Sequence, residues 1–418
     1  MHNSFYINNR KKLISKLEDE VCLILLSSGY TICKSYDEDY DFKVNNNFYY
    51  LAGIIQPMVH LLLIKDKDSY QECLFIDEYD EMYEKWVGHR LTRKEASDIS
   101  GIAESNIKYI KDFDNTLNEL FKKYQTIYLD LEKNRNFNHH SFGLFMENKL
   151  QNEKVNIIDI YEHVIEIRAS KTDEEIEKIK QAIEITRIGI ENLMKHSKPG
   201  MYEYQLESYF DQTIKINGNR KHAFPTIAAS GVNATTLHYS SNDSIMKDGD
   251  LITFDLGCQV DEYNSDITRT FPINGKFSKL QKTIYNIVLD TNKLIEKKAH
   301  AGMTLRDLQE IAVKSLTDGC LKAKLIKKPD EIKNYYYHGV SHLIGLDTHD
   351  PITRNITLPE NSVISNEPGL YIKELNIGIR IEDDLLLLKD RAINLSKDII
   401  KEVSDIEKLM QNQEDKYE

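Results

Sequence analysis

Two aspartates stand eleven residues apart in segments that otherwise favour β-strands. Asp255 lies near the end of an apolar run at 251–257, and Asp266 begins a second such run at 265–271. A turn near 261–264 would fold the two runs into a hairpin and bring the carboxylates side by side. Adjacent carboxylates repel one another and lose hydration, which is costly unless a positive charge lies between them. The pair therefore predicts a site for a divalent cation.

A second pair of acids repeats this design. Glu367 and Glu382 each stand within an otherwise apolar, strand-like segment. Taken alone, any one of the four acids would be interpreted as a capped turn or a salt bridge. Their matched places favour a metal instead, because a Gly-Met pair at 200–201 and again at 302–303 begins a helical stretch that two such acids follow. The repetition predicts a duplicated αβ unit.

Three histidines lie within twelve residues of a glycine-punctuated apolar stretch, at His338, His342 and His349. A lone histidine is more often a structural hydrogen-bonding group, but such a cluster is typical of a functional site. One histidine among four carboxylates suits manganese, cobalt, iron or catalytic zinc. Four carboxylates balance two divalent ions, and two ions about 3.5–4 Å apart with a bridging water are the machinery of hydrolysis. The residues predict metal-assisted hydrolysis.

Composition limits the alternatives. The chain has 418 residues and a net charge of −13, with 67 acidic and 54 basic residues. This balance removes the main attraction to nucleic acid. The apolar stretches are shorter than the ~18 residues needed to cross a membrane, and the amino terminus lacks the apolar stretch of a secretory signal. The charge balance and the short apolar stretches therefore predict neither nucleic-acid nor membrane partners. Because five scattered cysteines show no CxxC spacing, we expect reduced thiols in a cytoplasmic protein.

The chain is expected to divide into two domains, over 1–168 and 169–418. In the first, apolar runs predict buried strands within a mixed α/β domain, and helical spacing predicts a helix over 112–123. A boundary follows, because Thr172 and Glu175 form a capping box that opens a long amphipathic helix. The strands are expected at 21–26, 60–65 and 73–76.

The five candidate ligands and their neighbours resemble a known family. In chain order they stand in the strings TFDLG, SDITRTFP, HGVSHLIGLDTHD, NEPGLY and GIRIEDD. This set is similar to that of the pita-bread metallopeptidases, and most similar to the aminopeptidase P (Xaa-Pro aminopeptidase) family. Stretches at 5–11, 41–53 and 86–91 resemble that family's amino-terminal domain. The resemblance implies an α+β fold, with a pita-bread catalytic domain of duplicated αβ halves preceded by a smaller mixed α/β domain.

The resemblance also implies a role for each ligand. Asp266 and Glu382 would bridge two divalent metal ions, Asp255 would bind one ion, and His342 and Glu367 would bind the other. Manganese is the expected metal, with cobalt and zinc as alternatives. Glu367 would also shuttle the proton of a metal-bridging hydroxide that attacks the scissile carbonyl. The implied reaction releases the amino-terminal residue of a peptide that has proline at the second position.

Further residues are implied around the metals. His349 would stabilise the tetrahedral intermediate, His238 and His338 would position the substrate and the leaving proline, and Arg380 would support a ligand carboxylate. A homodimer or homotetramer is implied as well, with the amino-terminal domain contributing contacts to the substrate site and the oligomer. In the family, a tryptophan of that domain approaches a neighbouring subunit's active site. From its residue type alone, Trp86 is instead expected to pack within its own domain.

Two departures from the family leave the peptide length open. Residues 224–227 read FPTI where relatives often carry a tyrosine, and the loop over 371–378 is short. A prolidase restricted to Xaa-Pro dipeptides is therefore an alternative, as is a pita-bread binding module without catalysis. Methionine aminopeptidases usually lack the long amino-terminal domain, and creatinase-like enzymes lose the metal carboxylates. The intact ligand set argues against the binding module.

Overall fold

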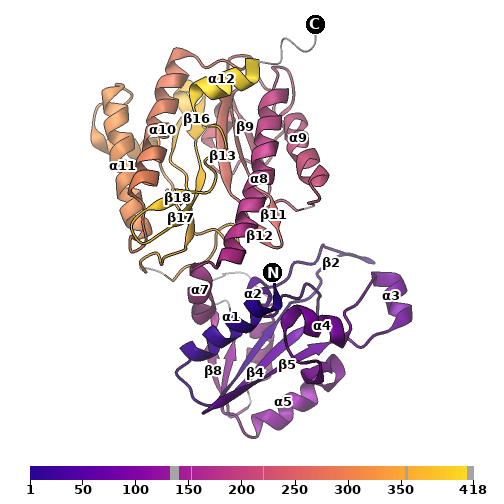
Figure 1. Cartoon of the computed structure of the whole chain (residues 1–418). Coiled ribbons are helices and arrows are strands. Elements are labelled where there is room, and N and C mark those ends of the chain that lie inside the picture. The colour runs from indigo at the N-terminus through magenta and orange to yellow at the C-terminus, as the bar shows by residue number, and fades with distance from the viewer. Residues whose placement is uncertain (132–140, 152, 220, 354–355, 412–418) are drawn as a thin grey trace. The chain divides into compact units, whose positions relative to one another are not determined.

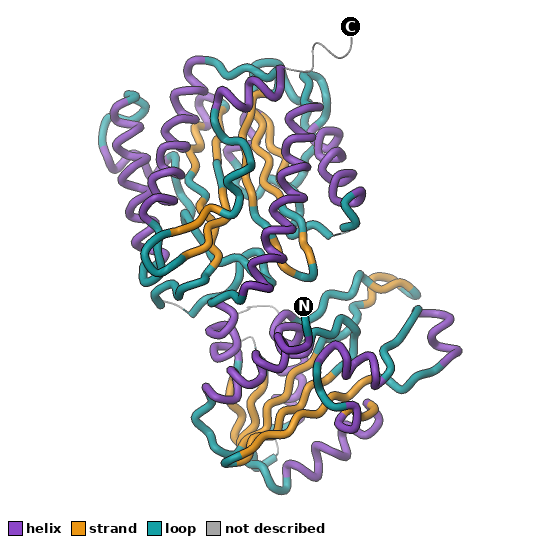
Figure 2. Tube along the Cα trace, viewed as in Figure 1, coloured by secondary structure: helices purple, strands orange, loops and turns teal. Residues whose placement is uncertain are grey.

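The computed structural model describes residues 1–131, 141–151, 153–219, 221–353 and 356–411 (Figures 1 and 2). Internal contacts separate two compact units, Met1–Arg168 and Ala169–Glu418. Within the described ranges, every helix is too short or too polar to cross a bilayer.

The first unit is built on a six-stranded mixed sheet. β1, β4 and β5 form an antiparallel set, whereas β6, β7 and β8 pair in parallel with their neighbours. All three expected strands are present, and β5 begins at Ser69 because its polar first half pairs with β4 across a hairpin. In spatial order the strands are β6 (Ile107–Tyr109), β5 (Ser69–Ile76), β4 (His60–Asp66), β1 (Cys22–Ser27), β7 (Thr126–Leu129) and β8 (Asn156–Asp159).

Helices cover this sheet and explain its apolar strands. Every residue of β1 is buried, as expected for a strand covered on both faces. The helix expected over 112–123 is confirmed as α5 (Phe113–Phe121), which packs with α6 (Phe142–Lys149) on a core that includes strand residues of β1, β4, β5 and β7. The other helices are α1 (Asn3–Lys16), α2 (Asn46–Ala52), α3 (Glu81–Val87), α4 (Arg93–Ser100) and α7 (Tyr161–Ala169).

One expectation for this unit is wrong. Trp86 on α3 is 83% exposed rather than packed. The reason is that α3 buries none of its residues, so it has no inner face into which the indole could turn. A short exposed hairpin of β2 (Cys33–Ser35) and β3 (Glu38–Asp39) also belongs to this unit.

The second unit consists of two similar αβ halves, which confirms the expected duplication. Figure 1 shows its strands between the α8–α9 pair and the α10–α11 pair. The first half contains α8 (Asp173–His196), α9 (Glu203–Ile216), β9 (Ile227–Ser230), β10 (Leu251–Leu256), β11 (Gln259–Val260), β12 (Tyr263–Asn264) and β13 (Ile267–Pro272). The second contains α10 (Lys279–Lys298), α11 (Leu305–Lys322), β14 (Val363–Asn366), β15 (Gly369–Ile372), β16 (Ile377–Arg380), β17 (Asp383–Leu387) and β18 (Ala392–Asn394), and α12 (Val403–Gln411) follows.

Local sequence signals set where these helices begin. The Thr172 side chain accepts from the Glu175 amide and the Glu175 carboxylate accepts from the Thr172 amide, so the predicted capping box opens α8. The helix is amphipathic as expected, because Ile176, Ile179 and Ile183 are buried. α9 and α11 each begin two residues after a Gly-Met pair, at Glu203 and Leu305. The capping box and the two Gly-Met pairs therefore fix where α8, α9 and α11 begin, and in chain order each helix pair precedes the strands that carry the acids.

Candidate metal centre

A hairpin positions the two aspartates. β10 and β13 pair antiparallel, with Asp255 opposite Thr268. β11 and β12 extend the connection as a short ribbon, and Asp261 and Glu262 close it with φ values of 48° and 68°, which a type I′ turn requires. Because side chains alternate along a strand, Asp266 shares the face of Thr268 and hence of Asp255. The expected hairpin is confirmed, with an additional ribbon at its tip.

The sequence suggested that the two glutamates lie within strands. In the structure they lie at strand ends instead. Glu367 follows β14 and precedes Pro368, which has no amide hydrogen with which to continue a strand ladder. Glu382 lies between β16 and β17. Its amide donates to the Thr268 carbonyl at 3.0 Å, and Thr268 Oγ1 donates to Glu382 Oε2 at 2.6 Å. Thr268 thus joins Glu382 to the aspartate hairpin.

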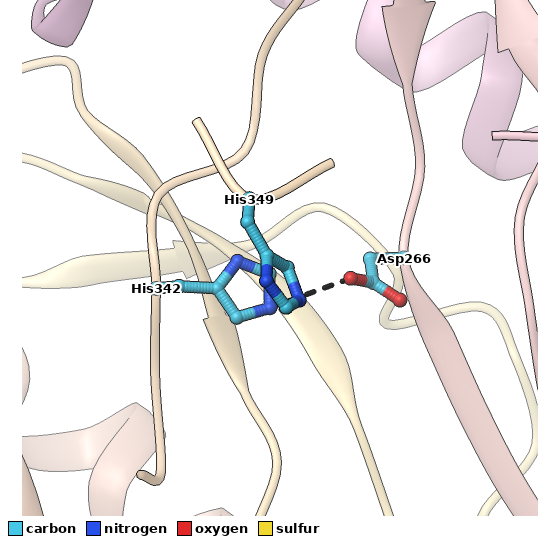
Figure 3. Close-up of side chains that lie close together, drawn as sticks. All are labelled: Asp266, His342 and His349. Atoms are coloured by element: carbon cyan, nitrogen blue, oxygen red, sulfur yellow. Dashed lines mark ion pairs between the residues drawn. The ribbon is translucent and has the colours of Figure 1, made fainter. Parts of the chain in front are cut away.

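His342 completes a cluster of five side chains. Its Nε2 lies 3.4 Å from Asp266 Oδ2 and 3.4 Å from Glu367 Oε1, and Figure 3 shows the ring directed toward Asp266. Its Nδ1 lies 3.0 Å from the Leu343 carbonyl, which can only accept, so Nδ1 carries the hydrogen and Nε2 is free to bind a metal. Three sets have ligand atoms within 4.8 Å of one another: Asp266, His342 and His349; His342, Glu367 and Glu382; and Asp255, Asp266 and Glu382.

The carboxylates of this cluster are held in an unfavourable electrostatic setting. Burial and the nearby charges of Asp255 and Asp384 raise the pKa of Asp266 well above its usual range. Burial and the charge of Asp266 do the same to the pKa of Glu382, and burial raises the pKa of Glu367. Asp255 Oδ1 is buried without a hydrogen-bond partner in the described part of the chain. Divalent cations fit this donor set, because they supply the missing positive charge.

Arg380 lies beside the cluster. It is 5% exposed and donates to Asp255 Oδ2 at 2.5 Å and to the Tyr371 hydroxyl at 3.0 Å. The Tyr371 hydroxyl lies 2.8 Å from His338 Nε2. Because His338 Nδ1 contacts the Gly339 carbonyl, Nε2 is the acceptor and Tyr371 donates to it. Sequence reasoning missed Tyr371, although its position at the end of the NEPGLY string could have indicated it.

A cavity of about 640 Å³ opens onto the cluster. Burial lowers the pKa of His338 and of His349 to about 4, so both rings are neutral near pH 7. The His349 ring centroid lies 4.0 Å from that of His342 (Figure 3). Phe224, Pro225 and Ile227, from the FPTI string, form an apolar part of the wall. All nine site residues that the sequence singled out line this cavity: Asp255, Asp266, His238, His338, His342, His349, Glu367, Arg380 and Glu382.

Buried charges behind the ligands were not predicted. The Arg269 guanidinium is fully buried and donates to the Glu382 carbonyl at 2.5 Å and to Asp383 Oδ1 at 2.7 Å. Lys401 Nζ donates to the other oxygen of Asp383 at 2.5 Å. Although burial opposes ionisation of Asp383, these two cations hold its pKa well below the usual range. The charged string around Glu382 was the available signal, but only the fold shows its partners.

Comparison with known proteins identifies the family of the chain. Residues 177–389 match metallopeptidase family M24, and residues 6–128 match the aminopeptidase P amino-terminal domain. The chain therefore belongs to metallopeptidase family M24, which confirms the resemblance and the pita-bread fold.

Similar proteins cover at least 96% of the chain. The Xaa-Pro aminopeptidase of Escherichia coli (strain K12) is 29% identical over 437 residues, with 96% of each chain covered. A solved structure from Bacillus anthracis has a TM-score of 0.96 at 45% identity, covering 99% of both chains. The structure of aminopeptidase P from E. coli with the inhibitor Pro-Leu has a TM-score of 0.91 at 30% identity, covering 100% of both.

Proposed function

We propose that the chain is a dinuclear metal-dependent aminopeptidase that releases the amino-terminal residue of peptides with proline at the second position. The observation that carries this proposal is the meeting of all nine predicted residues in one cavity. The chain is also similar, over 96% of its length, to proteins named Xaa-Pro aminopeptidase. A proline bond suits such a dedicated site, since the imide nitrogen carries no hydrogen for ordinary peptide recognition.

The five ligands define the reacting centre in this proposal. Two divalent ions held by Asp255, Asp266, His342, Glu367 and Glu382 would supply an acidified water as nucleophile and polarise the scissile carbonyl. Glu367, whose pKa burial raises, accepts the proton of the attacking water and delivers it to the leaving proline nitrogen. Arg380 holds the carboxylate of Asp255 in place through its 2.5 Å hydrogen bond.

The histidines of the cavity bind the substrate. His349, kept neutral by burial, is placed beside His342 to donate to the carbonyl oxygen as charge develops on it. His338 is oriented by the Tyr371 hydroxyl and contacts the leaving side of the peptide, together with His238. The apolar wall formed by 224–227 suits the proline ring, because a pyrrolidine offers only carbon to its surroundings.

A paired substrate panel tests the proposal. The manganese-reconstituted protein is given an Xaa-Pro dipeptide and an Xaa-Pro-Yaa tripeptide, and release of the first residue is measured for each. We expect release from the tripeptide. Cleavage of the dipeptide alone would show a prolidase, and cleavage of neither would support a binding module. Asp266→Ala should abolish release while the chain still folds. Asp290→Ala, on the exposed side of α10, is the matched control and should retain release of the first residue.

Manganese is the proposed metal, because the donor set is rich in oxygen. One solved relative is a zinc-substituted aminopeptidase P of E. coli in complex with product, so zinc and cobalt belong in the same reconstitution series. Release of the first residue is measured for each metal at equal occupancy. Greatest turnover with another metal would contradict the assignment of manganese.

The unit over 1–168 is proposed to make oligomer contacts and to contribute to a neighbouring subunit's substrate site. The exposed apolar side chains of α3, including Trp86, support this role. We propose a homodimer or homotetramer, and Trp86→Ala should weaken it in analytical ultracentrifugation without altering metal content. An unchanged sedimentation coefficient in Trp86→Ala would contradict the contact. A cytoplasmic location is proposed from the cysteines, all five of which are free thiols.

A further inference from the structure

One buried carboxylate outside the metal centre has five hydrogen-bond donors. Glu203, the first residue of α9, is 0% exposed. Its Oε1 accepts from the Ser230 amide at 2.7 Å, the Ser230 hydroxyl at 2.7 Å and the Asn233 side chain at 3.1 Å. Its Oε2 accepts from the Tyr239 hydroxyl at 2.9 Å and the Ser244 amide at 3.0 Å. One carboxylate thus accepts hydrogen bonds from two backbone amides and three side chains.

The chemistry of these contacts requires a carboxylate. Glu203 has no basic partner among the described residues, so its donors alone compensate for its burial. Hydrogen bonds to an ionised oxygen are shorter and stronger than neutral ones. A glutamine at this position would offer one acceptor oxygen, and its amide nitrogen would meet donors on the other side. Glu203 therefore fixes where its partners lie, in addition to filling space.

All five donors belong to the segment 230–244, which forms part of the cavity wall. This segment carries His238, which lines the cavity and is exposed toward it. His238 makes no hydrogen bond of its own within the described part of the chain, so its place follows from the backbone on either side. The next residue, Tyr239, is bonded to Glu203 and packs against a small cluster of Ile227, Ala229 and Ala234.

We propose that Glu203 is the positioning residue of this wall, holding the segment 230–244 so that His238 meets the substrate. The inference rests on the proposed function, in which His238 contacts the peptide. Glu203 does not line the cavity, and the five metal ligands lie outside the segment. Loss of Glu203 should therefore affect substrate use and leave metal binding intact. A displacement of about 1 Å in such a group can cost about 100-fold in rate.

Two matched glutamine substitutions on α9 test the proposal. Glu203→Gln removes the five-donor acceptor. Glu207→Gln is the control one turn later, where the carboxylate has a single side-chain donor in the same segment, Asn242 at 2.9 Å, from which a glutamine oxygen can still accept. We expect Glu203→Gln to lower kcat/KM for an Xaa-Pro-Yaa tripeptide by about 10- to 100-fold. Amide hydrogen exchange should accelerate over 230–244 in that variant only. The manganese affinity of both variants, measured by titration calorimetry, should match that of the wild type.

A double-mutant cycle with His238→Ala then decides whether Glu203 acts through His238. In the His238→Ala protein, adding Glu203→Gln should lower kcat/KM further by less than about twofold. The proposal is wrong if Glu203→Gln lowers kcat/KM of the His238→Ala protein by the same factor as that of the wild type. It is also wrong if manganese affinity falls together with activity. Tyr239→Phe, which removes one donor only, provides the same cycle should Glu203→Gln fail to fold. A wild-type protein that binds manganese but releases no residue would refute the proposed function, while hydrogen exchange still reports on the segment.

Discussion

Stripping the divalent metal should lower the melting temperature of the second unit, and Asp266 should account for most of that loss. Ligand oxygens of Asp255, Asp266 and Glu382 lie within 4.8 Å of one another. At that separation two full charges repel by about 3.5 kcal/mol for an effective dielectric constant of about 20. In the metal-free chain Arg380 and protonation of the carboxylates relieve part of this repulsion. Bound cations would remove it.

The pH dependence of the metal-free protein follows from the same cluster. Burial and neighbouring charges raise the pKa of Asp266, so the folded chain keeps a proton that the unfolded chain releases above its ordinary pKa of about 3.9. Stability must therefore fall as pH rises from about 4 through the raised pKa, and then level off. Manganese should flatten this fall, because it stabilises the ionised carboxylates.

Calorimetric unfolding measures the effect. Manganese at about 100 times its dissociation constant adds about 2.7 kcal/mol for one site. For a unit of 250 residues, Ala169–Glu418, each kcal/mol added to the free energy of unfolding raises the melting temperature by about 2–4 °C. We therefore expect a rise of about 5–11 °C for each occupied metal site. The scans compare chelator-treated and manganese-loaded protein at pH 6 and pH 8.

Two charge-removing variants locate the origin of the shift. Metal-free Asp266→Asn should be at least as stable as the metal-free wild type, because one repelling charge is gone, and manganese should stabilise it far less. Asp290→Asn changes the same charge at an exposed position of α10 and should behave as the wild type. Equal stabilisation of Asp266→Asn and wild type by manganese, or a large loss in the metal-free variant, would refute the electrostatic reasoning.

Three further outcomes are expected. Arg380→Met should weaken manganese binding by about 10- to 100-fold in titration calorimetry, because Asp255 loses the donor that orients it; unchanged affinity would contradict this. Since burial lowers the pKa of His349 to about 4, its titration should cause no fall in kcat/KM near pH 6.5 as the solution is acidified. A fall near pH 6.5 that disappears in His349→Gln would contradict this expectation. Lys171→Met breaks the fully buried pair with Asp350 (2.9 Å) and should cost about 3–5 kcal/mol in denaturant unfolding; a loss below about 1 kcal/mol would show the pair to be dispensable.

Much of the site could be predicted from local patterns. Asp255 on β10 and Asp266 directly before β13 lie close together because a period of two and a tight turn define a hairpin within about twenty residues, and the structure has that hairpin. The capping box at Thr172 likewise acts over three residues, and α8 begins there. Glu367 and Glu382 were correctly associated with strands but lie at strand ends, since Pro368 ends β14 for reasons of backbone chemistry.

The amino-acid sequence by itself determined the ligand types, their order and the local elements that carry them. Only the tertiary structure decided which distant groups meet, such as Arg380 with Asp255 across 125 residues and Thr268 with Glu382 across 114. It also brought Glu203 into hydrogen-bond contact with the segment 230–244, which carries His238, and it left Trp86 exposed. The physical reason is that periodicity and capping act within a few residues, whereas burial, charge pairing and cavity shape arise when the two halves of the second unit pack together.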